Sequence, residues 1–216
     1  DDAVADGATV PIRYTSRKTD WQVDPAKIDI LFDQWFANES EERIDAIKQR
    51  GITLADLVKH SQRIKLIAFD IWTHFRQHAM PDGFKAQVVA IDREAIILYK
   101  RALTEVIADY YVHEGMADDE AIEKAEGMSV CVYSSAQSDS GHQSEDSWIQ
   151  SIRDDLVKYQ ISGDDEKAAI KSFTDDPAGP GLLIVCSKLL TGFDAPIESV
   201  MYLDSPLKDH NLLQAI

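Results

Sequence analysis

The sequence is poor in positive charge. It carries 22 lysines and arginines against 38 aspartates and glutamates, so its formal net charge is −16 over 216 residues. This balance excludes a broadly basic surface that grips nucleic acid by releasing counterions. Any contact with DNA is therefore expected to be local.

Charge is also uneven along the chain. Residues 101–146 hold eleven acidic side chains against two basic ones, and we interpret this block as a solvated excursion. Residues 61–101 hold seven basic side chains against four acidic ones. A phosphate-facing strip is one hypothesis for the basic residues of this region, which are Arg63, Lys65, Arg76, Lys85 and Arg93.

Cysteine is scarce, and long hydrophobic runs are absent. Cys131 and Cys186 lie in apolar stretches without the spacing of a zinc site, which favours a reduced, cytoplasmic compartment. No apolar run approaches the ~20 residues of a membrane span, and the start DDAVADG lacks the regions of a secretory signal. We expect no membrane contact. The missing initiator Met and the end at LLQAI indicate a fragment of a longer protein.

Several catalytic motifs are missing as well. The chain has no GxxxxGK[ST] loop, no GxGxxG, no HExxH and no GxSxG. His74 and His78 are four residues apart but have no third ligand, so no metal site is predicted. The residue types of a metal-dependent nuclease motif occur in Pro81-Asp82 and in residues 165–167, but the two parts are too far apart in the sequence to form one compact unit. Nuclease chemistry within this chain is not expected.

Hydrophobic periodicity divides the chain into three parts. Residues 1–20 form an entry arm or linker with one short β segment, and residues 21–83 form a helical layer. Its first helix carries five apolar residues at helical spacing, from Ile28 to Phe36. A second helix runs from Glu41 to Gln49 and stops at Gly51, and a third ends before Pro81.

From residue 84 onward, short apolar runs alternate with helical patterns. The runs predicted as strands are AQVVAI after Lys85, Met128–Ser135, Leu182–Ser187 and Ser199–Pro206. Such strands are typical of a parallel sheet covered on both faces, so the predicted fold class is α/β with a preceding helical layer. Ligands of such sheets meet the carboxyl ends of the strands, so residues 92–93, 134–139, 188–194 and 204–208 are candidates.

The final stretch reads LLIVCSKLLTGFDAPIESVMYLDSPLKDHNLLQAI. A buried strand leads into a loop in which Gly192 permits a sharp turn, Thr191 offers a hydroxyl and Asp194 a carboxylate. A second strand and a helix carrying Gln214 follow. This order of strand, loop, strand and helix resembles the second RecA-like domain of superfamily 2 helicases and translocases. The amino-acid sequence of the stretch resembles that of the motor subunit of type I restriction endonucleases. The similarity extends from about Phe84 to Ile216.

The resemblance implies roles for individual residues. Motif V falls on Thr191, Gly192 and Asp194, and motif VI begins at Gln214, so residues 84–216 correspond to a second motor domain that ends within motif VI. Lys85, Arg93 and Lys188 are candidate DNA-phosphate contacts. In this family ATP and Mg²⁺ are bound mainly by a first motor domain, and the partners are double-stranded DNA and the specificity and methyltransferase subunits. This chain on its own is therefore expected to be inactive.

Two alternatives remain open. The chain could be a stand-alone α/β binding or scaffold domain whose LTGFDAP loop is only structural, or part of another superfamily 2 nucleic-acid motor. The sequence after Ile216 would distinguish a scaffold domain from a motor, since a motor continues with the arginines of motif VI. The domains attached to the motor would distinguish a type I restriction enzyme from another superfamily 2 motor.

Overall fold

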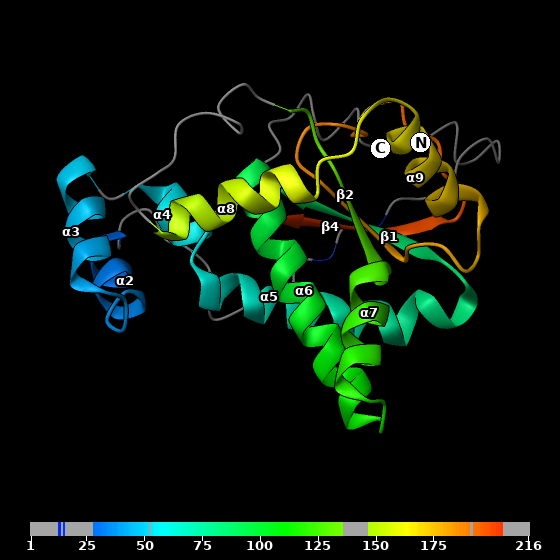
Figure 1. Cartoon of the computed structure of the whole chain (residues 1–216), viewed down its shortest axis with the longest axis horizontal. Helices are drawn as coiled ribbons and strands as arrows, with labels where there is room; N and C mark the ends of the chain where they lie inside the picture. The colour runs from blue at the N-terminus through cyan, green and yellow to red at the C-terminus, as the bar shows by residue number, and fades with distance from the viewer. Residues whose placement is uncertain are drawn as a thin grey trace.

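The computed structural model describes residues 13, 15, 28–51, 53–135, 147–190 and 192–204. Its strands are β1 (Lys85–Ala90), β2 (Ser129–Val132), β3 (Leu182–Val185) and β4 (Glu198–Asp204). Its α-helices are α2 (Ile28–Trp35), α3 (Glu41–Arg50), α4 (Leu54–Val58), α5 (Ser61–His78), α6 (Arg93–His113), α7 (Asp118–Met128), α8 (Ser147–Lys158) and α9 (Gly163–Asp175). Figure 1 shows the sheet at the centre with helices on both sides.

The four strands form one sheet in the order β2-β3-β1-β4, and every pair is parallel. All residues of β1 and β3 are buried, which is the environment that nearly continuous apolar strands require. The α/β fold class with a RecA-like parallel sheet is confirmed, and so are the four predicted strands.

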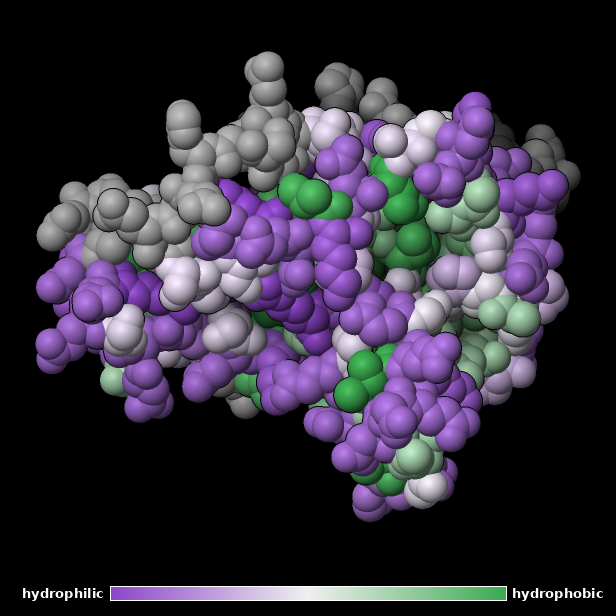
Figure 2. All heavy atoms as spheres, viewed as in Figure 1, coloured by the Kyte–Doolittle hydropathy of each residue, from purple (hydrophilic) through white to green (hydrophobic). Residues whose placement is uncertain are grey.

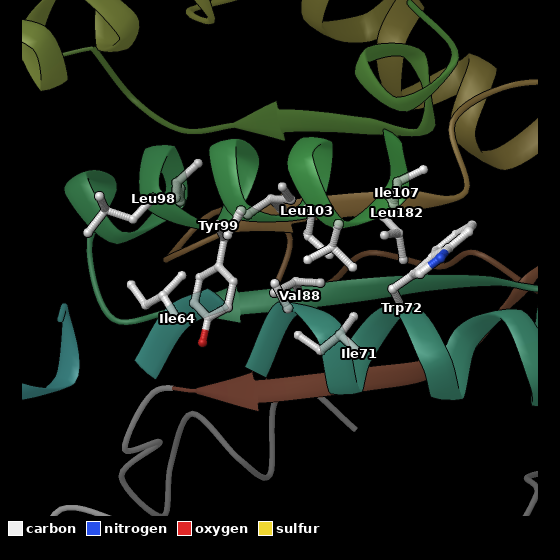
Figure 3. Close-up of a cluster of buried hydrophobic side chains, with 14 of the residues drawn as sticks. Ile64, Ile71, Trp72, Val88, Leu98, Tyr99, Leu103, Ile107 and Leu182 are labelled. Carbon is white, nitrogen blue, oxygen red and sulfur yellow. The ribbon is translucent and has the colours of Figure 1, made fainter. Parts of the chain in front are cut away.

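Each face of the sheet has its own core. On one face, α5 and α6 pack against Ala86, Val88 and Ala90 of β1, and α7 and α8 pack around α6. Figure 3 shows Tyr99 and Leu103 of α6 and Ile71 of α5 on either side of Val88. On the other face, Phe173 of α9 packs with Val89 of β1 and with β3. Alternate residues of β1 therefore point to opposite cores, as the period of a strand requires.

The region predicted as one helical layer has two parts in the structure. Phe32 and Trp35 of α2 and the following Phe36 form a small separate core with Ile47 and Leu57. The third predicted helix is α5, which belongs to the core of the sheet instead. The second predicted helix is confirmed: the Ser40 side chain caps α3 and Gly51 ends it with a φ of 85°.

The acidic block contains a helix that the sequence patterns did not predict. Helix α7 begins with Asp118, Asp119 and Glu120, which are favourably placed against the helix dipole. Ala121 and Ala125, four residues apart, are fully buried against α6. The part of the block from 118 to 128 is thus packed through its small residues, while its acidic side faces solvent.

Most of the surface on the side of α6, α7 and α8 is hydrophilic (Figure 2). Within the described ranges, no helix combines the length and apolarity that crossing a bilayer requires. The β segment predicted within residues 1–20 lies outside the described residues, apart from Arg13 and Thr15.

Candidate functional site

The carboxyl ends of the four strands meet at one edge of the sheet, and charged residues are paired there. Asp92 follows β1 and caps α6 by accepting a 2.8 Å hydrogen bond from the Ala95 amide. Its other carboxylate oxygen lies 3.1 Å from the Lys59 ammonium, which also binds Glu94. Burial alone would lower the pKa of Lys59, but the two carboxylates outweigh it and raise that pKa. The turn before α5 is thereby fixed to the start of α6.

A second and more buried cluster lies at the end of β4. Arg63 of α5 donates to both oxygens of Asp204 at 2.6 and 2.8 Å, and Tyr99 of α6 donates to the same carboxylate at 2.6 Å. In Figure 3 the Tyr99 ring reaches down from α6 with its hydroxyl beside α5. Burial and the charge of Asp204 raise the pKa of Tyr99 well above 10. The cluster ties the last residue of β4 to two helices.

Residues 186–197 connect the carboxyl end of β3 to the amino end of β4, and the described residues of this stretch form no helix. Because both strands are parallel to β1, this crossover segment has to return across the sheet, and it does so on the α9 face. The ring centres of Phe193 and Phe173 are 6.4 Å apart. The Phe173 ring also contacts the ammonium of Lys85, which lies at the amino end of β1. Of residues 188–194, which the sequence predicted at the carboxyl edge, Lys188 closely follows β3 and Phe193 packs on the α9 face.

Three contacts hold the first half of the crossover segment. The Lys188 ammonium lies 2.7 and 2.8 Å from the two carboxylate oxygens of Glu166 on α9. The side-chain amide of Gln87 on β1 donates to the Leu189 carbonyl at 3.3 Å. Leu190 is buried in the core under α9. Leu189, between them, has a φ of 61°, which is rare for a residue with a side chain.

Of the residues that the sequence predicts as motif V, the structure describes Gly192 and Asp194, and both lie on the surface. Gly192 has a φ of 68°, so the sharp turn predicted at this glycine is present, and a Cβ there would meet nothing within 4 Å. Asp194 is exposed. Thr191 and Gln214 lie outside the described residues, so their predicted roles stay predictions.

The three candidate phosphate contacts lie in different places. Lys85 is 3% exposed at the amino end of β1, and its ammonium donates to the carbonyls of Asp176 and Ser172. Lys188 pairs with Glu166 on the α9 face. Arg93 lies at the carboxyl edge and donates to the Ser134 carbonyl at 3.4 Å, bridging the chain ends that follow β1 and β2. The three residues do not form one patch.

The hypothesis of a positive strip over residues 61–101 is wrong for Arg63 and Lys85, which are buried. Arg63 is buried against Asp204, and Lys85 is buried under α9. Lys65 pairs with Glu105, and the Arg76 guanidinium lies 4.6 Å from the centre of the Tyr110 ring. Each of these basic residues contacts a partner that is distant in the sequence, and the sequence could not reveal these partners.

The described residues do not form a metal site. No group of three or more histidines, cysteines, aspartates or glutamates in the described ranges could hold an ion. Both cysteines are free thiols, and burial raises the pKa of Cys131 to about 12 and also raises that of Cys186. Neither thiol is therefore a ready nucleophile at neutral pH. We assign no Mg²⁺ ligand and no covalent chemistry to these residues.

Comparisons with known proteins identify relatives of one kind. Residues 101–216 match the model of the family described as type I restriction enzyme subunit R domain 3. Over its whole length the chain is 32% and 29% identical to two putative type I restriction enzyme endonuclease subunits of Methanocaldococcus jannaschii, MjaVIIP and MjaVIIIP. It is 30% identical to the HindI endonuclease subunit of Haemophilus influenzae.

The chain spans about a fifth of the length of these relatives, 20% of the two archaeal subunits and 18% of the bacterial one. The matching family model covers the strands β2, β3 and β4 and the crossover segment between the last two. The chain therefore belongs to the family of domain 3 of the type I restriction enzyme subunit R.

Proposed function

We propose that this chain is the second RecA-like motor domain of an ATP-driven translocase of double-stranded DNA within a type I restriction enzyme. The observation that carries the proposal is the family match over residues 101–216, which includes the crossover segment with its T-G-F-D sequence. The relatives are type I restriction endonuclease subunits, and an enzyme of that kind requires contact with DNA.

In the proposed mechanism the crossover segment forms one wall of a cleft, and ATP and Mg²⁺ are held mainly by a first motor domain. Gly192 has no side chain, so its backbone can approach a DNA phosphate closely, and the Thr191 hydroxyl and amide are further donors. Contacts of this kind position the DNA strand without reading its sequence. The Asp194 carboxylate would orient neighbouring groups near the nucleotide.

The acidic composition agrees with a motor domain that contacts DNA through only a few residues. A translocase has to release DNA at every step, and a chain with a net charge of −16 does not hold DNA through a broad basic surface. Arg93 is the one candidate phosphate contact that we keep, because it lies at the carboxyl edge. Lys85 is left out of the proposal because its ammonium binds two carbonyls beneath α9.

The experiment is the substitution Asp194→Ala in the full-length subunit, assembled with its specificity and methyltransferase subunits. We expect DNA-stimulated ATP hydrolysis to fall by about 10²-fold, the usual cost of removing one preorganised polar group from an active site. Circular dichroism and the unfolding midpoint should stay unchanged, since Asp194 is exposed.

The matched control is Asp165→Ala, which removes an exposed carboxylate from α9 outside the crossover segment. It should hydrolyse ATP at the wild-type rate. Wild-type turnover by a folded Asp194→Ala protein would remove Asp194 from the mechanism.

A further inference from the structure

Gln87 is a polar residue in the most buried part of the molecule. It is the third residue of β1, which lies between β3 and β4 in the sheet, and its side chain is 0% exposed. It points toward the α9 face, where its neighbours on the same side of β1 are Lys85 and Val89. The sheet itself requires no amide at this position, since an apolar side chain of the same size would fill it.

The hydrogen bonds of Gln87 are incomplete. Its amide nitrogen donates to the Leu189 carbonyl in the crossover segment, at 3.3 Å. Its amide oxygen is buried and accepts no hydrogen bond within the part of the chain that the structure describes. A buried acceptor without a partner costs stability, and an apolar isostere at such a site is often neutral or stabilising. Stability alone therefore does not account for this residue.

The residue that Gln87 holds is itself in an unfavourable conformation. Leu189 has a φ of 61°, a left-handed backbone that a residue with a side chain adopts only when its surroundings enforce it. Lys188 before it is tied to Glu166, and Leu190 after it is buried. The bond from Gln87 acts on the carbonyl between these two anchors, so its loss would release the strain and move the residues that follow.

We infer that Gln87 is a positioning residue, which holds the crossover segment from the centre of the sheet so that Gly192 and Asp194 are presented at its surface. The inference rests on the function proposed above for that segment. Gln87 contacts neither nucleotide nor DNA, and it acts through the backbone of Leu189.

The test is Gln87→Met in the full-length subunit assembled with its partner subunits. Methionine keeps the length and flexibility of the side chain but removes both the donor and the unpaired acceptor. We expect the midpoint of urea unfolding to stay the same or rise. The kcat of DNA-stimulated ATP hydrolysis should fall roughly tenfold, because the crossover segment would no longer be held in its reactive position, with little change in the KM for ATP.

The matched control is Met201→Leu. Met201 is the partner of Gln87 in the register of β1 and β4, and it packs on the same face of the sheet. This swap conserves volume and touches no hydrogen bond, so both kcat and the unfolding midpoint should remain near wild type.

Assaying Asp194→Ala in parallel separates the two hypotheses. A slow Asp194→Ala protein together with a Gln87→Met protein of wild-type rate would overturn the inference and leave the proposed function standing. A Gln87→Met protein that is both slow and clearly less stable would also overturn it, because the residue would then be structural. Wild-type rates in both variants would overturn the inference and the proposed function together.

Discussion

Two buried polar groups, one on each face of the sheet, differ in how completely their hydrogen bonds are satisfied. On the α5 and α6 face, the Asp204 carboxylate receives hydrogen bonds from both Arg63 and Tyr99. On the α9 face, Gln87 makes one hydrogen bond, its amide oxygen has no partner among the described residues, and the residue that it binds has a left-handed conformation. The Asp204 cluster is a rigid frame that ties β4 to two helices, whereas Gln87 and the left-handed Leu189 are unfavourable features that meet at the crossover segment.

The largest effect expected from this contrast is that of Arg63→Met. The substitution leaves the buried Asp204 carboxylate with the Tyr99 hydroxyl as its one side-chain partner among the described residues, and breaking a buried pair in this way costs about 3–5 kcal/mol. The side chains of Arg63 and Asp204 are only 10% and 17% exposed, so solvent cannot replace the lost partner. Urea unfolding of the full chain, followed by circular dichroism, measures the change.

Lys65→Met is the control for the loss of a positive charge from α5. Lys65 and its partner Glu105 are 51% and 54% exposed, and such surface pairs contribute about 0–1 kcal/mol. Equal losses from the two substitutions would mean that the Asp204 cluster is not the rigid frame described above.

The two ends of β4 repeat the contrast and predict a dependence on pH. Asp204 ends the strand with two partners, whereas Glu198 begins it with no side-chain partner among the described residues. Burial raises the pKa of Glu198 from its ordinary 4.5 to about 7. Between these two values the folded protein keeps a proton that the unfolded chain has lost, so this residue makes stability fall as pH rises through the interval.

Glu198→Gln should remove that part of the pH dependence. At pH 8 the variant should be more stable than the wild type by about 1–3 kcal/mol, and at pH 4 the two should be equal. Urea unfolding at a series of pH values measures the difference, and the exposed Glu123→Gln on α7 should keep the wild-type slope. A Glu198→Gln protein with an unchanged slope would contradict the assigned desolvation.

The smallest effect concerns glycine in the crossover segment. Gly192→Ala should cost about 1–2 kcal/mol, because the φ of 68° is unfavourable for alanine although there is space for its Cβ. Gly127→Ala, in helix α7 with nothing within 4 Å of the new Cβ, should stabilise by about 0.5–1 kcal/mol. Thermal unfolding compares the two, and a shift of the same sign in both would indicate that the Gly192 turn relaxes easily.

The sequence was sufficient to predict the sheet because its strands are short, apolar and buried. The runs AQVVAI and LLIVCS are almost entirely apolar, which fits a parallel strand buried on both faces. Their alternation with helices determines the fold class. Helix α7 escaped prediction because its burial depends on Ala121 and Ala125, which carry a weak hydrophobic signal inside an acidic block. The sequence signal for this helix was the i, i+4 spacing of the two alanines directly after three acidic residues, which favour a helix N-terminus.

The polar contacts around the site could not be predicted, because they join residues that are distant in the sequence. Arg63 and Asp204 are 141 positions apart, and Gln87 and Leu189 are 102 apart. In the sequence Gln87 is one polar letter in an apolar strand, and Arg63 is one of several basic residues on a helix. The path of the crossover segment across the α9 face also depends on the strand order, which the sequence did not provide.

The most direct measurement is a structure of the full-length subunit bound to double-stranded DNA and a non-hydrolysable ATP analogue. The account predicts that the backbone around Thr191 and Gly192 lies within hydrogen-bonding distance, about 3 Å, of a phosphate oxygen. It also predicts that Leu189 keeps its left-handed conformation with Gln87 beneath it. A crossover segment that faces solvent or an unrelated domain, remote from both nucleotide and DNA, would contradict it.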